Sequence, residues 1–261
     1  MKKSRLITIS GVALLSLAVL GACSSADESS DSTDAKEKVL RVGTEGTYSP
    51  FSYRDADDKL VGYDVEVAEA VAKKIGYQIE FVDSPWDSML AAFDADKTDV
   101  VFNQVSITDE RKEKYDFSVP YSVSHVALIT KKGNTEINDF TDLDGKKSAQ
   151  SLTSNFATLA EEHGAELVTT DGFSKSAELV LDGQADATLN DDVTFYDYLN
   201  QKPDAELEIA KVSDETTEVG ALFHKGDDEL REAVDEALTE LHDDGTLTKL
   251  SEEYFDKDIS K

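Results

Sequence analysis

Residues 103 to 121 combine the features of a binding site for a small anion. They follow the apolar run 100–102 and turn polar at once, which is typical of a buried strand that surfaces at its carboxyl end. Thr108 has the residue type and position of a helix N-cap, and Arg111 follows within the first turn. Small ligands bind at such strand-to-helix junctions, and the planar fork of an arginine beside the hydroxyl of Ser106 suits a carboxylate.

The same local sequence has a second interpretation. Arg111 is flanked by Asp109, Glu110 and Glu113, and charge runs of this kind are usually the solvated face of a helix. Local sequence alone favours this interpretation, so the choice depends on the rest of the chain.

Two further kinds of side chain have a suitable chemistry. Hydroxyl groups gather at Ser151, Thr153 and Ser154, where a turn can cap the next helix or hold an anion through its backbone N–H groups. Tyr48 and Trp86, the only tryptophan, can each pack in a core or offer a ring to a ligand. Periodicity does not decide between these roles.

Alternating strands and helices must position these residues. The predicted strands cover 39–43, 77–82, 99–105, 125–130, 147–150 and 219–223, with a loop at 44–53, and the predicted helices cover 64–75, 87–93, 156–163, 227–242 and 247–254. A pattern of helix end, turn, Asp and polar strand exit occurs at 90–104 and again at 179–191. We therefore expect two similar α/β lobes that present polar side chains at their strand ends.

Composition and charge narrow the function. The 261 residues are 39% hydrophobic, which is enough apolar material for two lobes with real cores. The formal net charge is −29, whereas phosphate binding needs the opposite sign, so nucleic acid is not an expected partner.

The N-terminus has the pattern of an exported lipoprotein. A basic start precedes the apolar run 6–20, which is too short to span a membrane as a mature helix. The following residues, Leu20-Gly21-Ala22-Cys23, resemble the lipobox in which the cysteine is acylated. We expect a signal peptide at 1–22 and a lipidated flexible tether at 23–38, the alternative being an ordinary signal peptide with an incidental cysteine.

Several motifs together resemble a known family. They are GYDVEV at 62–67, SITDER at 106–111 with YDFSVPY at 115–121, GQADATLND at 183–191 and GTLTKLSEEYF at 245–255. In these segments the chain resembles the extracellular solute-binding proteins of family three, which are polar amino-acid receptors of ATP-driven importers. The resemblance runs from about 39 to 258.

The resemblance implies an α/β fold of the two-lobed, periplasmic-binding-protein-like type II kind, with a ligand cleft between the lobes. It places the first part of lobe 1 at 39–122, an inserted lobe 2 at 123–220, and the return to lobe 1 with the C-terminal helices at 221–261. The two hinge crossings are expected near 122–126 and 218–222.

The resemblance also implies roles for individual residues. Arg111 would grip the ligand α-carboxylate with help from Ser106, and Asp191 would receive the α-ammonium. Thr153 and Ser154 would donate hydrogen bonds from the second lobe to the carboxylate.

The ligand side chain is harder to assign. Tyr48 and Trp86 match positions that sandwich the ligand. The segment 103–106, which contains Gln104, and the segment 148–155 look most like the cystine-binding branch. Glu45 is a candidate carboxylate for a basic ligand, which leaves lysine, arginine and histidine open, and glutamine is the other neutral possibility.

The implied partners are an amino acid and the permease and ATPase subunits of an importer. We expect a monomer without cofactor or metal, anchored through Cys23 to the outer face of the bacterial cytoplasmic membrane. The same fold also occurs in dehydratases, in murein-cleaving enzymes and in sensor domains of kinases. The four histidines fall in no metal-ligand spacing, so we do not expect an enzyme, and we expect no attached signalling domain.

Overall fold

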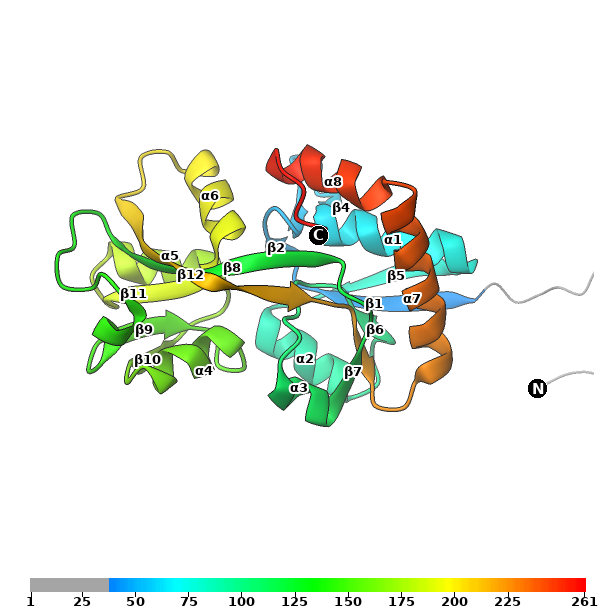
Figure 1. The fold of residues 1–261 in the computed structure, drawn as a ribbon, viewed down its shortest axis with the longest axis horizontal. Coiled ribbons are helices and arrows are strands. Elements are labelled where there is room, and N and C mark those ends of the chain that lie inside the picture. Colours follow the sequence, from blue (N-terminus) through cyan, green and yellow to red (C-terminus); the bar gives the residue numbers. More distant parts are fainter. Residues whose placement is uncertain (1–37) are drawn as a thin grey trace, which may run out of the picture. The chain divides into compact units, whose positions relative to one another are not determined.

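Two five-stranded sheets organise residues 38–261, the part of the chain that the computed structural model describes. The strand order is β5-β1-β6-β13-β7 in the first sheet and β10-β9-β11-β8-β12 in the second. In Figure 1 the helices of each lobe surround its own sheet, and the long strands β8 and β12 run from one lobe to the other. The predicted two-lobed α/β fold is confirmed.

The first lobe mixes parallel and antiparallel strands. Strand β1 pairs in parallel with β5 and β6, whereas β13 pairs antiparallel with β6 and β7. The strands are β1 (Val39–Thr44), β5 (Gln78–Asp83), β6 (Val100–Val101), β7 (Tyr115–Phe117) and β13 (Leu222–His224). The helices are α1 (Tyr63–Ile75), α2 (Trp86–Asp94), α3 (Asp109–Lys114), α7 (Asp228–Asp243) and α8 (Thr246–Phe255). A small antiparallel sheet of β2 (Thr47–Tyr48), β3 (Ser52–Arg54) and β4 (Leu60–Val61) completes this lobe.

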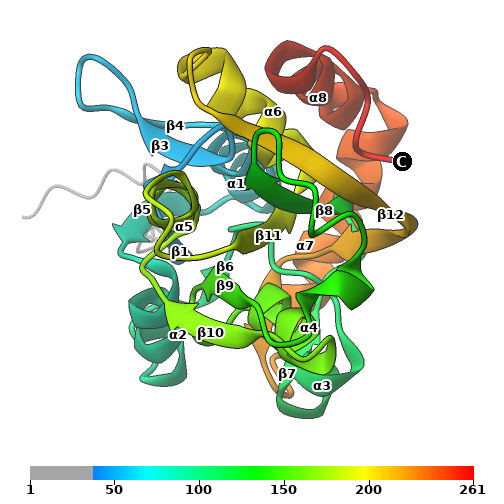
Figure 2. The ribbon, with the colours of Figure 1, turned by 90° about the vertical axis from the view of Figure 1, so that its left-hand side faces the viewer.

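The second lobe is built between the two connecting strands. Its strands are β8 (Ser122–Lys131), β9 (Lys147–Gln150), β10 (Glu166–Thr169), β11 (Ala187–Asp191) and β12 (Leu207–Val219). Its helices are α4 (Asn155–Glu162), α5 (Phe173–Leu181) and α6 (Asp192–Gln201), with a 3-10 turn, η1, at Phe140–Leu143. Figure 2 looks onto this lobe, with the three helices around the sheet. Antiparallel pairing of β8 with β12 runs from Ser122 opposite Val219 to Lys131 opposite Leu207.

Glycines fix the start and end of α1. At Gly62, where φ is +132°, an added Cβ would lie 2.2 Å from the carbonyl oxygen of Phe51, so no other residue fits without moving the backbone. Gly76 ends the helix in the left-handed conformation. Between them the apolar face, including Val67 and Val71, is buried. Directly after Gly62, the backbone N–H groups of Tyr63 and Asp64 donate to the carbonyl oxygens of Pro50 and Phe51.

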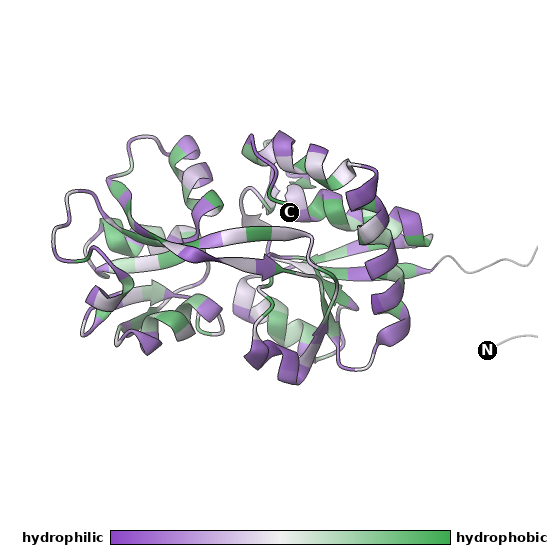
Figure 3. Cartoon of the chain, in the orientation of Figure 1, coloured by the Kyte–Doolittle hydropathy of each residue, from purple (hydrophilic) through white to green (hydrophobic). Residues whose placement is uncertain are grey.

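Apolar residues concentrate on the strands and on the inner helix faces. In Figure 3 the hydrophilic colour dominates the visible faces of α3 and α7. The buried side chains of α7 are Val234, Ala237, Leu238 and Leu241, at helical spacing. Within residues 38–261 no helix has both the length and the apolar character that crossing a bilayer requires.

Three expectations about local structure are wrong. Residues 44–53, expected as a loop, contain β2 and β3. The strand expected at 99–105 ends at Val101, and the chain then turns through Gln104, whose φ is +50°. The strand expected at 219–223 is two elements, because Val219 closes β12 and β13 begins later.

The predicted signal peptide at 1–22, the predicted lipid attachment site Cys23 and the predicted tether as far as residue 37 lie outside the described residues.

Candidate functional site

Strand ends and helix starts from both lobes converge on one small cavity of about 40 Å³. The first lobe contributes Glu45 after β1, Tyr48 in β2, Trp86 at the start of α2 and Gln104 after β6. The second lobe contributes Ser151, Ser154, Asn155, Phe156, Gly172, Phe173 and Asn190. A cavity of this size holds only a few water molecules, so a larger ligand requires the lobes to separate.

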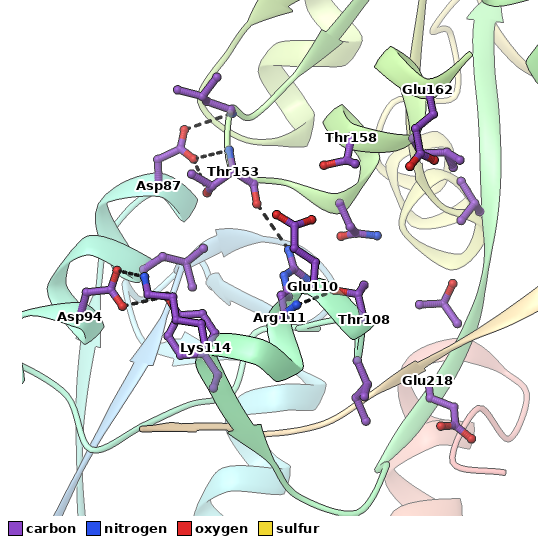
Figure 4. A pocket seen from close by; sticks show the side chains of 18 of the residues that line it. Asp87, Asp94, Thr108, Glu110, Arg111, Lys114, Thr153, Thr158, Glu162 and Glu218 are labelled. Carbon is purple, nitrogen blue, oxygen red and sulfur yellow. Dashed lines mark hydrogen bonds and ion pairs between the residues drawn. The ribbon is translucent and has the colours of Figure 1, made fainter. Parts of the chain in front are cut away.

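A groove of about 1030 Å³ lies beside this cavity and is shown in Figure 4. Asp87 and Arg111 line it from the first lobe, and Thr153 and Glu162 line it from the second. The indole Nε1 of Trp86, which lines the cavity, donates to Thr153 Oγ1 at 2.9 Å. This contact lies between the cavity and the groove.

Arg111 is held at the groove by its own helix and by both lobes. Its backbone N–H donates to the Thr108 side chain, which caps α3 as expected. The guanidinium donates to the carbonyl oxygen of Ser106 at 3.1 Å and to that of Thr153 at 3.4 Å. Its carbon lies 5.3 Å from the centre of the Trp86 ring. Burial lowers the pKa of Arg111 to about 10, so the group stays charged at neutral pH.

Arg111 differs from the other arginines of residues 38–261 in having no acidic partner. Arg41, Arg54 and Arg231 each form an ion pair with an aspartate, whereas Arg111 forms none, even with its acidic neighbours in α3. Two of its five N–H groups have carbonyl partners. The remaining donors are available to a ligand that enters between the lobes.

Asp191 provides a buried negative charge in the second lobe. It ends β11 and is only 2% exposed. Its carboxylate accepts from Ser124 Oγ at 2.5 Å and from the hydroxyl of Tyr48 at 3.2 Å. Burial raises the pKa of Asp191 to about 6. Tyr48 lines the cavity and also donates to Asn190, so the Asp191 carboxylate lies one side chain away from the cavity.

Several hydrogen bonds join the two lobes. Asp87 of α2 accepts from the backbone N–H of Thr153 at 2.9 Å and from its hydroxyl at 2.6 Å. Farther along the cleft, Gln201 Nε2 donates to Ser49 Oγ at 2.8 Å. Together with the Tyr48 contacts, these bonds define a closed arrangement of the lobes.

Three of the predicted site residues use their polar groups within the protein. Ser106 is buried, and its carbonyl accepts from Arg111. The side chain of Ser154 accepts from the backbone N–H of Phe156 and caps α4. The amide of Gln104 donates to Asp64 at 2.7 Å and accepts from Ser122 at 3.0 Å.

Sequence reasoning missed two polar residues that shape the site. They are Asp64, which holds Gln104, and Asp87, which joins the lobes. Asn103, which the sequence placed at a polar strand exit, contacts Glu45. The only signal for Asp64 was a carboxylate beside the apolar face of α1. Within residues 38–261 no three His, Cys, Asp or Glu side chains are grouped so that they could hold a metal ion.

The buried carboxylates predict that stability depends on pH. Burial raises the pKa values of Glu45 and Asp64 to about 7, against about 4 in an unfolded chain. Between these pH values the folded protein therefore binds more protons than the unfolded chain. The stabilisation that these two carboxyl groups contribute is lost as pH rises from about 4 to 7. By differential scanning calorimetry we expect the ligand-free protein to melt several degrees lower at pH 8 than at pH 5.

Asp64→Asn tests this prediction, because Gln104 can turn its amide and still bond to the new side chain and to Ser122. The melting temperature of the variant should depend less on pH than that of the wild type. Equal melting temperatures of the wild type at both pH values would contradict the prediction.

Residues 40–257 match the family described as bacterial extracellular solute-binding proteins, family 3. The L-cystine-binding protein TcyA of Bacillus subtilis (strain 168) is 40% identical over 259 residues, which cover 95% of this chain and 96% of that protein.

Two solved structures, one with a bound ligand and one without, are similar to this chain. An ancestral arginine-binding protein bound to arginine is 36% identical, with a TM-score of 0.78 over 84% of this chain and 99% of the other. The L-cystine solute receptor of Neisseria gonorrhoeae in its unliganded open conformation is 45% identical, with a TM-score of 0.57 over 87% of this chain and 96% of the other. The better fit to the ligand-bound protein, despite lower identity, agrees with the closed arrangement described above. On the family match and these full-length similarities, the chain belongs to the bacterial extracellular solute-binding proteins of family 3.

Proposed function

We propose that this protein is the extracellular substrate-binding lipoprotein of an amino-acid ABC importer, and that its ligand is L-cystine. The observation that carries the proposal is the charge arrangement of the cleft. Among residues 38–261, Arg111 of the first lobe has no acidic partner, and Asp191 of the second lobe is a buried carboxylate without a cation. The relatives TcyA and the Neisseria gonorrhoeae receptor, both named for L-cystine, support the choice of ligand.

A free amino acid matches these two groups. Its α-carboxylate accepts from the free donors of Arg111, and its α-ammonium replaces the Tyr48 hydroxyl at Asp191. Each charge-assisted hydrogen bond contributes on the order of 1.5 to 3 kcal/mol, so two or three of them together with aromatic contact to the ligand can reach roughly micromolar affinity after the cost of closure. Because the two groups belong to different lobes, only the closed form satisfies both ends of the ligand.

The connecting strands supply the motion. We propose that lobe 1 comprises 39–122 and 221–261, that lobe 2 comprises 123–220, and that the lobes close about hinges near 122–126 and 218–222. Paired antiparallel strands make both crossings, so they can bend together while each sheet stays rigid. Closure is then the signal that the permease reads.

The proposed setting follows from the chain's N-terminus. Cys23 anchors the protein by lipid to the outer face of the bacterial cytoplasmic membrane, and the folded part delivers its ligand to the permease, which works with an ATPase subunit. The protein acts as a monomer without cofactor and carries out no reaction on the ligand.

A receptor for a basic amino acid is the second candidate. Glu45 is a buried carboxylate that lines the cavity, which favours a ligand with a second positive charge. The similarity to the arginine-bound ancestral protein points the same way.

Isothermal titration calorimetry distinguishes these candidates. Protein starting at residue 24 should be unfolded and refolded to remove any carried ligand, then titrated with L-cystine, L-cysteine, L-glutamine, L-histidine, L-arginine and L-lysine. We expect micromolar binding of L-cystine and at least about 30-fold weaker binding of the others. Selective binding of another amino acid would show that L-cystine is not the ligand. Failure of all these amino acids to bind would overturn the proposed function.

The chain offers a sharp control for cystine against cysteine. Its single cysteine is Cys23, so the protein starting at residue 24 has no thiol and no disulfide. A phosphine reductant then changes only the ligand. Binding should disappear when the reductant converts L-cystine to L-cysteine.

A further inference from the structure

Asp87, in the first turn of α2, extends its carboxylate from the first lobe to the turn at 151–154 of the second. Its Oδ1 accepts from the backbone N–H of Thr153 at 2.9 Å and from the Thr153 hydroxyl at 2.6 Å. Its Oδ2 accepts from the backbone N–H of Leu152 at 3.3 Å. Figure 4 shows this carboxylate facing the turn. Within residues 38–261 Asp87 forms no ion pair, so donors of the second lobe satisfy its charge.

Thr153 is bonded to the first lobe through every one of its polar groups. Its N–H donates to Asp87, and its carbonyl oxygen accepts from Arg111. Its hydroxyl oxygen lies 2.6 Å from Asp87 Oδ1 and 2.9 Å from Trp86 Nε1. Because an indole N–H only donates and a carboxylate only accepts, the hydroxyl accepts from Trp86 and donates to Asp87. In the closed arrangement, both donors of Thr153 are therefore occupied by a carboxylate of the protein itself.

This chain of hydrogen bonds connects the cavity with the contact between the lobes. Trp86 lines the cavity, whereas Thr153 and Asp87 line the groove beside it. A ligand that packs against the indole ring fixes the direction of its N–H. Each bond of such a chain polarises the next and strengthens it. Filling of the cavity and attachment of the lobes at Asp87 therefore favour each other.

We propose that Asp87 is a positioning residue for ligand binding, whose bonds to Leu152 and Thr153 hold the closed form and so set how long the cleft retains an amino acid. The carboxylate and its donors belong to different lobes, so these bonds are lost when the lobes separate. A contact confined to the closed form raises the apparent affinity without touching the ligand. The inference rests on the proposed function, because it assigns a residue that controls retention at the same site.

Two aspartates of α2 provide a matched pair of variants. Asp87→Ala removes the contact between the lobes. Asp94→Ala is the control, because Asp94 accepts from Lys114 and Tyr115 of its own lobe, each at 2.7 Å. Trp86 is the only tryptophan of the chain and lines the cavity, so its fluorescence reports ligand release in stopped-flow dilution.

We expect L-cystine to leave Asp87→Ala about 10-fold faster than it leaves the wild type, with association changed less than about 3-fold. Calorimetry should show affinity weakened by about the same 10-fold factor. Asp94→Ala should match the wild type in both measurements.

Thr153→Val distinguishes a contact between the lobes from a contact with the ligand. It removes the hydroxyl and should weaken L-cystine binding by about 10-fold in the wild-type background. In the Asp87→Ala background the same change should cost about 3-fold or less, because the hydroxyl has already lost its acceptor. Equal losses in both backgrounds would place the hydroxyl on the ligand and overturn the role of Asp87.

The other outcomes separate the inference from the proposed function. Unchanged release of L-cystine from Asp87→Ala overturns the inference while the importer function stands. Tighter binding by Asp87→Ala also overturns it, because Asp87 would then compete with the ligand carboxylate for the donors of Thr153. If the wild type binds a different amino acid, the choice of L-cystine fails, and the 10-fold faster release is expected with that ligand. No binding of any amino acid by the wild type overturns the proposed function itself.

A second variant guards against a folding artefact. Asp87→Asn keeps the shape of the side chain and one accepting oxygen but loses the charge, so release should be about 3-fold faster than from the wild type. Both Asp87 variants should melt within about 4 °C of the wild type, because the bonds that they lose join the lobes and do not belong to either core.

Discussion

Arg111→Ala is expected to weaken L-cystine binding by at least about 100-fold. The side chain is the one arginine of residues 38–261 without an ion pair, and its free donors face the space between the lobes. Losing two charge-assisted bonds to a carboxylate removes on the order of 3 to 6 kcal/mol. Isothermal titration calorimetry at pH 7.5 measures the loss.

The same substitution should leave stability almost unchanged. Arg111 has two hydrogen bonds to backbone carbonyls, the longer at 3.4 Å, and its burial is not compensated by an acidic partner. We therefore expect a melting temperature within about 2 °C of the wild type. A residue that matters for binding and not for stability has the signature of a ligand contact.

Two further variants define the chemistry. Arg111→Lys keeps the charge and loses the planar fork, so binding should weaken by about 10-fold or more. Arg231→Ala is the matched control, since this arginine of α7 pairs with Asp235 and does not line the cavity or the groove. It should bind L-cystine like the wild type. Normal binding by Arg111→Ala would remove Arg111 from the site.

The fold could be predicted where local patterns and tertiary structure agree. Strand β9 lies at its predicted bounds of 147–150. Helices α1, α7 and α8 begin and end within a residue or two of prediction, because each has an apolar face at helical spacing. Strand β12 was missed because its middle is exposed and polar. It is a strand through its pairing with β8, which no local window contains.

The candidate site shows the same limit. The sequence placed Arg111 after a helix cap. Whether its charge is solvated or buried without an acidic partner depends on Trp86 and Thr153, which lie far from it in the chain. Asp64 is the first residue of the predicted helix 64–75, where an aspartate favours a helix N-terminus in water. Only its bond to Gln104, 40 residues later, explains why it is buried.

Asp191→Asn is the second substitution with a large expected effect. The new amide has nearly the same shape, and the hydroxyls of Ser124 and Tyr48 can each donate or accept, so the local geometry should persist. What disappears is the negative charge opposite the ligand ammonium. We expect L-cystine binding to weaken by roughly 50- to 500-fold at pH 7.5, measured by calorimetry. Unchanged binding would exclude Asp191 from contact with the ammonium.

The pH profile separates this charge effect from a general disturbance. Burial raises the pKa of Asp191 to about 6, and a bound ammonium favours the ionised form. The contribution of Asp191 to affinity should therefore be full above pH 6 and be lost as pH drops through that value, because the ligand-free protein takes up a proton there. Asp191→Asn lacks this titration and should show a flatter profile between pH 7.5 and 5. If the variant and the wild type lose affinity in parallel over this range, the titrating group is elsewhere in the cleft, and the buried charge at Asp191 does not determine ammonium binding.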